Sequence, residues 1–184
     1  VCKNPFPAMP LKFWNDKKDL KFKEAYFNRF HNTWHHGDFA EIKKTRGFII
    51  HGRSDTTLNP GGVRLGTAEI YSEVEKFKEI KESIVVGQSW DNDVRIVLFI
   101  VMNEKFILSE DLLKKIKLQI RKNASPRHVP SKVIVVKDIP RTKSGKIVEL
   151  AVKNTIEGNN IKNKEALANP KALEQFKNFK ELTY

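Results

Sequence analysis

A polar loop that ends in a glycine–lysine pair is the feature of the sequence most suited to chemistry. Residues 140–146 read PRTKSGK, and Gly145 permits backbone angles that other residues rarely adopt. Lys146 comes directly before a predicted helix, where its side chain can carry a point charge to a phosphate or a carboxylate. On spacing alone, a simpler interpretation is favoured: a surface turn with exposed lysines.

The loop does not fit the P-loop of nucleotide-binding proteins. That motif has a glycine five residues before its Gly-Lys pair and a serine or threonine after the lysine. Here no glycine precedes Gly145 in the loop, Arg141 lies outside the pattern, and Ile147 follows the lysine. We therefore reject a P-loop for this segment.

Three histidines, His31, His35 and His36, are the other candidates for chemistry. On a helix, His31 and His35 would share a face and could bind a metal ion. No glutamate follows His31 as in the metalloprotease pattern. The single cysteine, Cys2, excludes an internal disulfide framework and a zinc site built from thiolates. We therefore predict no metal site in this chain.

The elements that must position the loop alternate along the second part of the chain. Apolar runs predict strands over residues 47–53, 83–87, 94–102 and 133–136, with turns at residues 59–62 and 91–93. This order of strands and intervening helices predicts an α+β fold with a small mixed β-sheet, one hairpin and flanking helices.

Apolar residues that recur every three or four positions predict the helices. One is capped by Thr67 with a stripe at residues 70, 74 and 77, one is capped by Ser109 with a stripe at Leu113, Ile116 and Ile120, and one covers residues 147–156. Residues 1–46 are aromatic-rich and show little periodicity. The tail has a weak amphipathic stretch at residues 170–182, which either packs on the body or is mobile.

The chain is basic, with 34 Lys and Arg against 22 Asp and Glu among 184 residues and a net charge of +12. Such a balance favours a phosphorylated cofactor or nucleic acid as a partner, or a simple solvated lysine-rich surface. The lysines are spread out, without the aromatic-interleaved basic stripe of single-strand binders. No apolar run of about 18 residues indicates a membrane span, and the lone cysteine suits a reducing cytoplasm.

Three segments together resemble the adenylate-forming enzymes, among them the acyl-CoA synthetases. Residues 34–38 (WHHGD) are similar to the family's Tyr/Trp-x-x-Gly-Asp motif, residues 52–70 (GRSDTTLNPGGVRLGTAEI) to its hinge and the glycine-bearing segment after it, and residues 140–146 to its catalytic-lysine loop. The resemblance covers nearly the whole chain. It implies the family's small C-terminal domain, preceded by a remnant of the large N-terminal domain.

The resemblance implies roles toward ATP and its adenylate. Lys146 would bridge the acyl carboxylate and the α-phosphate during adenylate formation, and Asp38 would accept hydrogen bonds from the ribose hydroxyls. Arg53 would hold the ribose or nearby phosphate oxygens, and Arg64 would line the same site. Asp55 would be the hinge about which the small domain turns between the two half-reactions.

The same resemblance implies a face for CoA. Gly62 would let the backbone approach the pantetheine arm closely, Arg64 would line that face, and Arg121 would pair with a CoA phosphate. Each position also has a simpler interpretation. Residues 61–62 could be only a turn, Asp38 could cap one, and Arg121 could balance a helix C-terminus.

The resemblance further implies how the chain is divided and what it does. Residues 1–54 would be the edge of the large adenylation domain, residues 55–157 the small mobile domain, and residues 158–184 an extension. The family's phosphate loop, acyl pocket and Mg²⁺ ligands would lie outside this chain, so the chain alone is expected to be inactive and to need the large N-terminal domain as its partner.

The substrates implied are ATP, CoA and a carboxylic acid. Residues 58–60, 125–131, 146–149 and 168–173 are similar to the members that activate acetoacetate. The acetyl- and propionyl-CoA synthetases usually carry a basic run after the Gly-Lys pair, from which Val148, Glu149 and Leu150 depart. These two enzymes are the first alternative, and a basic nucleic-acid-binding module is the second.

Overall fold

The computed structural model describes residues 1–161 and 163–183, and the chain divides into two compact units, Val1–Asp38 and Phe39–Tyr184. In the first unit, Trp34 is 4% exposed and stacks on Tyr26 with ring centroids 3.8 Å apart. Backbone hydrogen bonds join Cys2 to Trp34 in both directions. An aromatic cluster therefore organises this unit in place of a regular sheet.

Helix α1 (Leu20–Tyr26) belongs to this unit and follows a short 3-10 turn at Lys17–Asp19. Its first free amides, of Lys21 and Phe22, donate to the carboxylate of Asp16 at 3.0 and 2.8 Å. Residues 1–46 lack helical periodicity, so this helix was not predicted from the sequence. It has only seven residues, and its aromatic rings pack against Trp34 from several directions, so no stripe could form.

A two-stranded sheet of β1 (Asp38–Ile42) and β2 (Phe48–Arg53) begins at the boundary residue Asp38 and otherwise belongs to the second unit. Strand β2 was predicted from its apolar run, whereas β1 was not. Helix α2 (Thr67–Val74) follows, and its N-cap is Gly66, with no side-chain cap. The prediction that Thr67 caps this helix is therefore wrong: Thr67 is already helical and is 3% exposed.

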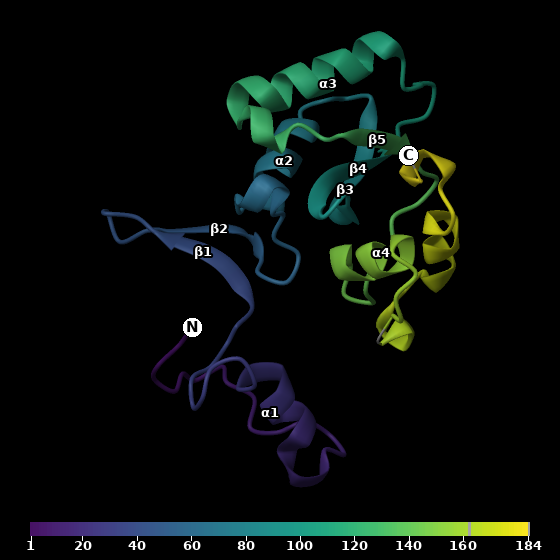
Figure 1. Ribbon diagram of the computed structural model, residues 1–184. Coiled ribbons are helices and arrows are strands. Elements are labelled where there is room, and N and C mark those ends of the chain that lie inside the picture. The colour runs from purple at the N-terminus through teal and green to yellow at the C-terminus, as the bar shows by residue number, and fades with distance from the viewer. Residues whose placement is uncertain (162, 184) are drawn as a thin grey trace. The chain divides into compact units, whose positions relative to one another are not determined.

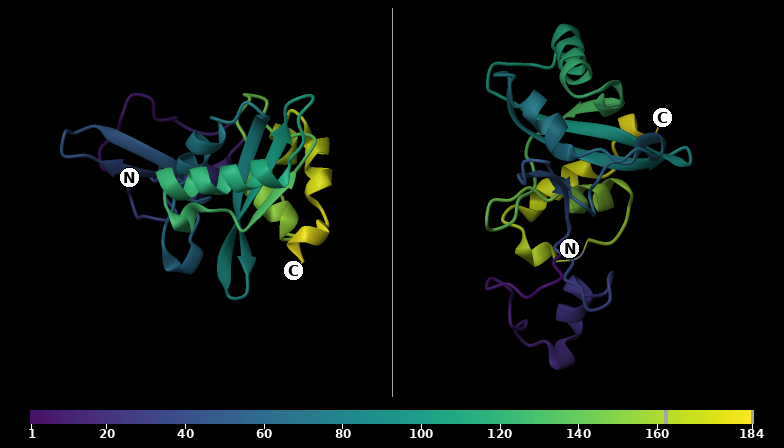
Figure 2. Two further views of the ribbon diagram at one scale, coloured as in Figure 1. Left: turned by 90° about the horizontal axis from the view of Figure 1, so that it is seen from above. Right: turned by 90° about the vertical axis from the view of Figure 1, so that its left-hand side faces the viewer.

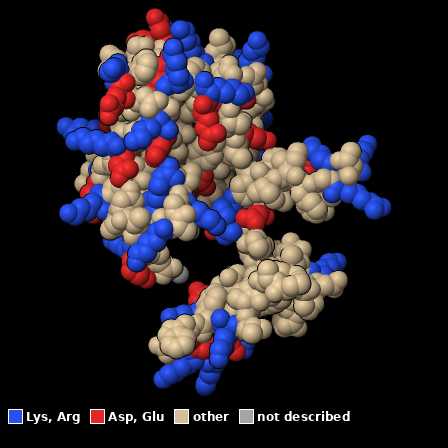
Figure 3. Space-filling view, turned by 180° about the vertical axis from the view of Figure 1, so that it is seen from behind, with Lys and Arg blue, Asp and Glu red and all other residues tan. Residues whose placement is uncertain are grey.

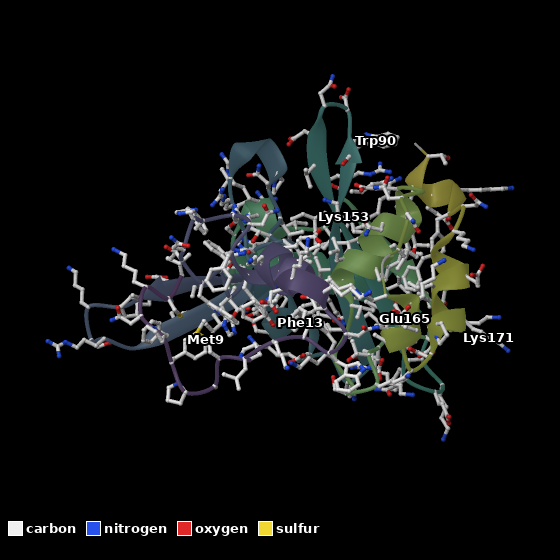
Figure 4. The ribbon with its side chains drawn as sticks, turned by 90° about the horizontal axis from the view of Figure 1, so that it is seen from below. Met9, Phe13, Trp90, Lys153, Glu165 and Lys171 are labelled. Atoms are coloured by element: carbon white, nitrogen blue, oxygen red, sulfur yellow. The ribbon has the colours of Figure 1, made fainter. Side chains whose placement is uncertain are left out.

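A three-stranded sheet in the order β3–β4–β5 forms the centre of this unit. Strands β3 (Ile80–Trp90) and β4 (Asp93–Met102) are antiparallel, and β5 (Lys132–Val135) runs parallel to β4. Asp91 and Asn92 connect β3 to β4 with φ of 48° and 58°, left-handed values typical of a two-residue hairpin turn. Trp90 lies beside this turn (Figure 4) and stacks on the guanidinium of Arg95 at 3.7 Å.

Helices cover both faces of the sheet (Figures 1 and 2). Helix α2 and helix α3 (Glu110–Asn123) pack on one face, and α4 (Glu149–Ile156) packs on the other with the C-terminal tail. Along β4, Ile96, Leu98 and Ile100 contact the first cluster, while Val97 and Phe99 contact the second. Because both faces of β4 are covered, the strand is a continuous apolar run.

Helix α3 begins as predicted, because the Ser109 hydroxyl accepts a hydrogen bond from the Leu112 amide at 3.2 Å. Its buried residues are Leu112, Ile116 and Ile120. The inclusion of Leu113 in the buried stripe was wrong by one position. Residues 112, 116 and 120 are each four apart and so stay on one face, whereas Leu113 is half-buried at its edge.

The tail packs on the body, which decides between the two alternatives that the sequence left open. It consists of short 3-10 turns at Lys164–Ala166, Pro170–Phe176 and Lys180–Leu182, and further turns of this kind lie at Pro60–Gly62 and Pro126–His128. Leu173 and Phe176 are 2% and 0% exposed. The Phe176 ring meets Phe99 of β4 edge to face at 4.9 Å.

Candidate active site

The lysine loop is a tight turn whose backbone is fixed while its lysine is exposed. The amide of Gly145 donates to the Thr142 carbonyl at 2.8 Å, and Gly145 has φ of 82°. The amide of Thr142 donates to the Lys146 carbonyl at 2.8 Å, and the Lys146 amide donates to the Thr142 hydroxyl at 3.1 Å. The main chain of Lys146 is therefore held, and its ammonium extends from an exposed residue.

The C-terminal tail pairs with this loop through an isolated antiparallel β-bridge between Thr142 and Leu167. The amide of Lys143 donates to the Ala166 carbonyl at 3.0 Å, and the amide of Ala168 donates to the Arg141 carbonyl at 2.8 Å. The side chain of Asn169 accepts from the Arg141 amide at 2.8 Å and donates to the Ile139 carbonyl at 3.0 Å. The tail thus satisfies backbone groups on the segment that leads into the loop.

The predicted hinge and one predicted nucleotide contact lie together. Arg53, the last residue of β2, donates from Nε to Asp55 Oδ1 at 3.3 Å and from Nη2 to Oδ2 at 3.4 Å. Both side chains are about half exposed, at 50% and 45%. In this conformation the carboxylate of the proposed hinge residue is therefore paired with the guanidinium of Arg53.

The predicted CoA face begins at a turn that two glycines make possible. Leu58 and Leu65 bridge the ends of the turn with backbone hydrogen bonds of 3.0 and 2.8 Å. Between them, Gly61 and Gly62 have φ of 58° and 76°. A Cβ added at Gly62 would meet nothing within 4 Å, so the backbone angle, rather than crowding by protein atoms, requires glycine here.

Neighbouring side chains hold this turn in place. The Gly61 amide donates to the Asp93 carboxylate at 2.9 Å. Arg64 follows the turn and is exposed, as is Arg121 in the last turn of α3. Both guanidinium groups can reach an anion in solvent, although Arg121 also lies where it complements the helix dipole.

A short chain of hydrogen-bonding groups leads from Trp34 through His36 to Asp38 in the first unit. The indole Nε1 of Trp34 donates to His36 Nδ1 at 3.2 Å, and His36 Nε2 lies 3.6 Å from the Asp38 carboxylate. Because Nδ1 accepts from the indole, Nε2 carries the proton and faces the carboxylate. His31 and His35 follow α1 instead of lying on it, so the helical face considered for a metal does not exist.

A carboxylate shared by two histidines was not predicted. Glu69 of α2 contacts His51 Nδ1 of β2 at 3.3 Å and His128 Nε2 at 2.5 Å. His128 is 6% exposed and its Nδ1 is 2.8 Å from the Ser125 hydroxyl. These contacts join β2, which precedes residue 55, to α2 and to the 3-10 turn at Pro126–His128, which follow it.

The surface charge and the possible metal ligands were also compared with the sequence predictions. On the face in Figure 3, Lys and Arg lie scattered among Asp and Glu instead of forming one stripe. Within residues 1–161 and 163–183, no group of three or more His, Cys, Asp or Glu side chains could hold a metal ion. Every helix in that described part is too short or too polar to traverse a bilayer.

The sequence interpretation also missed the side chains that hold the lysine loop in place. These are Tyr71, Glu82, Arg141, Glu149 and Asn169. Glu149 was noticed only as a departure from a basic run. Its partner Tyr71 is adjacent to the predicted stripe residue Ile70, and a polar ring beside a stripe was the available signal for a buried contact.

Comparison with known proteins shows which proteins this chain is similar to. Residues 69–146 match the AMP-binding enzyme C-terminal domain. The chain is 58% identical over 182 residues to the acetoacetyl-coenzyme A synthetase of Rhizobium meliloti (strain 1021), covering 99% of this chain and 28% of that protein. It is 47% identical to the acetoacetyl-CoA synthetase of Xenopus tropicalis, covering 99% of this chain and 27% of that protein.

A solved structure agrees with these matches. The acetoacetyl-CoA synthetase from Streptomyces lividans superposes with a TM-score of 0.87 and 38% identity, over 95% of this chain and 26% of that chain. The present chain thus spans little more than a quarter of the length of these relatives. The predicted α+β fold is confirmed, and residues 69–146 match the AMP-binding enzyme C-terminal domain within a chain that is similar over nearly its whole length to part of the acetoacetyl-CoA synthetases.

Proposed function

We propose that the protein is an AMP-forming acid–CoA ligase that activates acetoacetate. In the first half-reaction, a carboxylate oxygen of acetoacetate attacks the α-phosphorus of ATP, and pyrophosphate leaves. In the second, the CoA sulfur attacks the acyl carbon of the adenylate, AMP leaves and acetoacetyl-CoA forms. The acid is taken from the named relatives, of which the first is 58% identical.

The exposed ammonium of Lys146 on a fixed loop carries this proposal. Its backbone is held by hydrogen bonds to Thr142, so the side chain can present a charge at a defined place. Negative charge on the acyl carboxylate and the α-phosphate oxygens must be balanced as they approach each other. A positioned ammonium stabilises that transition state more than it stabilises the separated substrates.

The remaining site residues are assigned in two groups. Asp38, Arg53 and Arg64 face the nucleotide, with Asp38 accepting from ribose hydroxyls. Gly62, Arg64 and Arg121 face CoA, because a turn without side chains admits a thin pantetheine arm and guanidinium groups fork onto phosphate. Magnesium would accompany ATP, with its ligands outside this chain.

A large N-terminal domain is the proposed partner of this chain, and Asp55 is the proposed pivot between them. Residues 1–54 would form the edge of that domain and residues 55–157 the small domain that turns. The exposed Arg53–Asp55 pair supports this assignment, since an exposed ion pair at these distances is weak and easily exchanged. A cytoplasmic location completes the proposal, because Cys2 is a free thiol that needs no oxidising compartment.

The test compares Lys146→Ala with Lys143→Ala in the full-length protein. Lys143 is an exposed lysine on the same loop and serves as the matched control. Acetoacetate-dependent exchange of pyrophosphate into ATP reports the first half-reaction, and thioester formation from supplied acyl-adenylate reports the second. Lys146→Ala is expected to lower the first by about a hundred- to a thousandfold and to spare the second.

Three results would each overturn part of this proposal. Equal loss of both half-reactions in Lys146→Ala would remove the specific role of the ammonium in adenylation. Preference for acetate or propionate over acetoacetate in the exchange assay would replace the acid. Steeply salt-dependent binding of DNA or RNA, without any exchange activity, would favour the nucleic-acid-binding alternative.

A further inference from the structure

We propose that Tyr71 is a positioning residue for Lys146, acting through Glu149. This inference rests on the proposed role of Lys146 and extends it to a residue outside the proposed ATP and CoA sites. The tyrosine lies on α2, 75 positions before the lysine in the numbering of the chain. Its hydroxyl nevertheless binds the helix that begins directly after the lysine loop.

The Tyr71 hydroxyl makes two hydrogen bonds that connect three elements. It donates to Glu149 Oε1 at 2.6 Å and accepts from the Val85 amide at 3.0 Å. Val85 is a fully buried residue of the edge strand β3. Glu149 is the first residue of α4, three positions after Lys146. The hydroxyl therefore ties the C-terminal end of the lysine loop to the central sheet.

The tyrosine acts as a permanent donor in this contact. Burial of the hydroxyl raises the pKa of Tyr71 well above its usual range, and the neighbouring Glu149 charge raises it further. The phenol thus stays protonated, with its proton directed to the carboxylate and a lone pair free for the amide. Both polar neighbours would lose a partner if the hydroxyl were removed.

The other end of the loop is tied to the same strand. Arg141 Nη2 contacts the Glu82 carboxylate at 3.1 Å, and Arg141 Nη1 donates to the Gly145 carbonyl at 2.9 Å. Glu82 and Val85 are both residues of β3. The loop is consequently held at its start by Arg141 and at its end by Glu149, with β3 as the common support.

The Glu149 carboxylate is the group in the first turn of α4 that the Tyr71 hydroxyl holds. The N-cap residue is Val148, whose side chain cannot accept a hydrogen bond from the first turn. Without the tyrosine, the first turn of α4 would lose its hydrogen-bonded tie to β3, and the direction of the Lys146 side chain would become less defined. Misplacement of a catalytic group by about 1 Å can lower a rate about a hundredfold.

The experiment measures both half-reactions in the full-length protein carrying Tyr71→Phe, Glu149→Ala or Glu149→Gln. Tyr71→Phe is expected to slow acetoacetate-dependent pyrophosphate exchange by about ten- to a hundredfold. Thioester formation from supplied adenylate and the KM for CoA should stay near their original values. Glu149→Ala should behave like Tyr71→Phe, whereas Glu149→Gln keeps an acceptor oxygen and should retain most of the activity. Ser72→Ala, which removes an exposed hydroxyl from the same helix, is the control.

A double variant separates this inference from the function on which it rests. If Tyr71 acts through Lys146, Tyr71→Phe should add no further loss of exchange in a Lys146→Ala background. Full exchange activity in Tyr71→Phe, equal loss in both half-reactions, or an undiminished further loss in the double variant would each overturn the positioning role. Retention of exchange by Lys146→Ala alone would instead overturn the proposed function.

Discussion

Replacement of Phe176 by alanine should release the C-terminal tail from the sheet. The ring is 0% exposed and meets Phe99, also 0% exposed, edge to face at 4.9 Å. Two polar side chains that precede it in the tail, Asn169 and Gln175, bind backbone groups of residues 137–141. The apolar anchor and the polar contacts therefore belong to one unit, and loss of the anchor should loosen both.

The expected magnitude follows from the burial of the ring. Removal of a fully buried phenylalanine side chain costs about 3–5 kcal/mol, including the cavity that remains. Each 1.4 kcal/mol corresponds to about a tenfold change in an equilibrium constant. The population of the opened tail should therefore rise by between about a hundredfold and a few thousandfold. An opening of this size is readily measured by amide hydrogen exchange.

Hydrogen exchange of the full-length protein, followed by mass spectrometry of peptides, provides the assay. Peptides covering residues 137–146 and 166–177 should exchange faster in Phe176→Ala, while α3 should be unaffected. Phe106→Ala is the matched control, since Phe106 is 42% exposed. If both variants changed exchange in residues 166–177 equally, or if the tail alone loosened while residues 137–146 stayed protected, the described coupling between tail and loop would be refuted.

Two further predictions concern the stability of the domain. The Lys76 ammonium, with the amides of Asn123 and Gln119, holds the pKa of Glu73 below its ordinary value of 4.5. The ionised carboxylate therefore stabilises the folded state above pH 4.5, and this contribution is lost as the pH falls through the lowered pKa. Stability should depend less steeply on acid pH in Glu73→Gln, and identical acid unfolding curves would argue against the network. Gly66→Ala would place a Cβ 2.4 Å from the His51 carbonyl oxygen and should lower the free energy of unfolding, measured with a chemical denaturant, by about 1–3 kcal/mol. Gly47→Ala, whose Cβ would have its nearest neighbour at 3.7 Å, should change it little. Equal effects would contradict the close contact of α2 with β2.

Elements with a regular apolar pattern could be predicted from the sequence. Strand β4 and helix α3 bury long runs or stripes, so local periodicity reports their surroundings. Helix α1 and strand β1 could not be found in this way. The rings of α1 are half-buried in an irregular aromatic cluster, and β1 has one half-buried residue, Phe39, among exposed ones, so neither carries a repeat.

The candidate site was predicted through motifs, and its supports were not. Motif resemblance is local in the sequence, and it identified Lys146, Asp55 and Gly62 as candidates. The partners Tyr71 and Glu149 are 78 positions apart, and Asn169 is 28 positions from Arg141. Such pairings depend on which faces of the sheet the helices cover, and no local pattern carries that information.

The shared carboxylate of Glu69 has a consequence for motion at residue 55. One imidazole, that of His51, precedes the proposed pivot, while the other, that of His128, follows it and would move with α2. A turn of the backbone at Asp55 would therefore part Glu69 from the first ring and leave it bonded to the second. The Glu69 carboxylate would therefore keep one imidazole partner, His128, during the rotation, and His51 would contact it again on the return rotation.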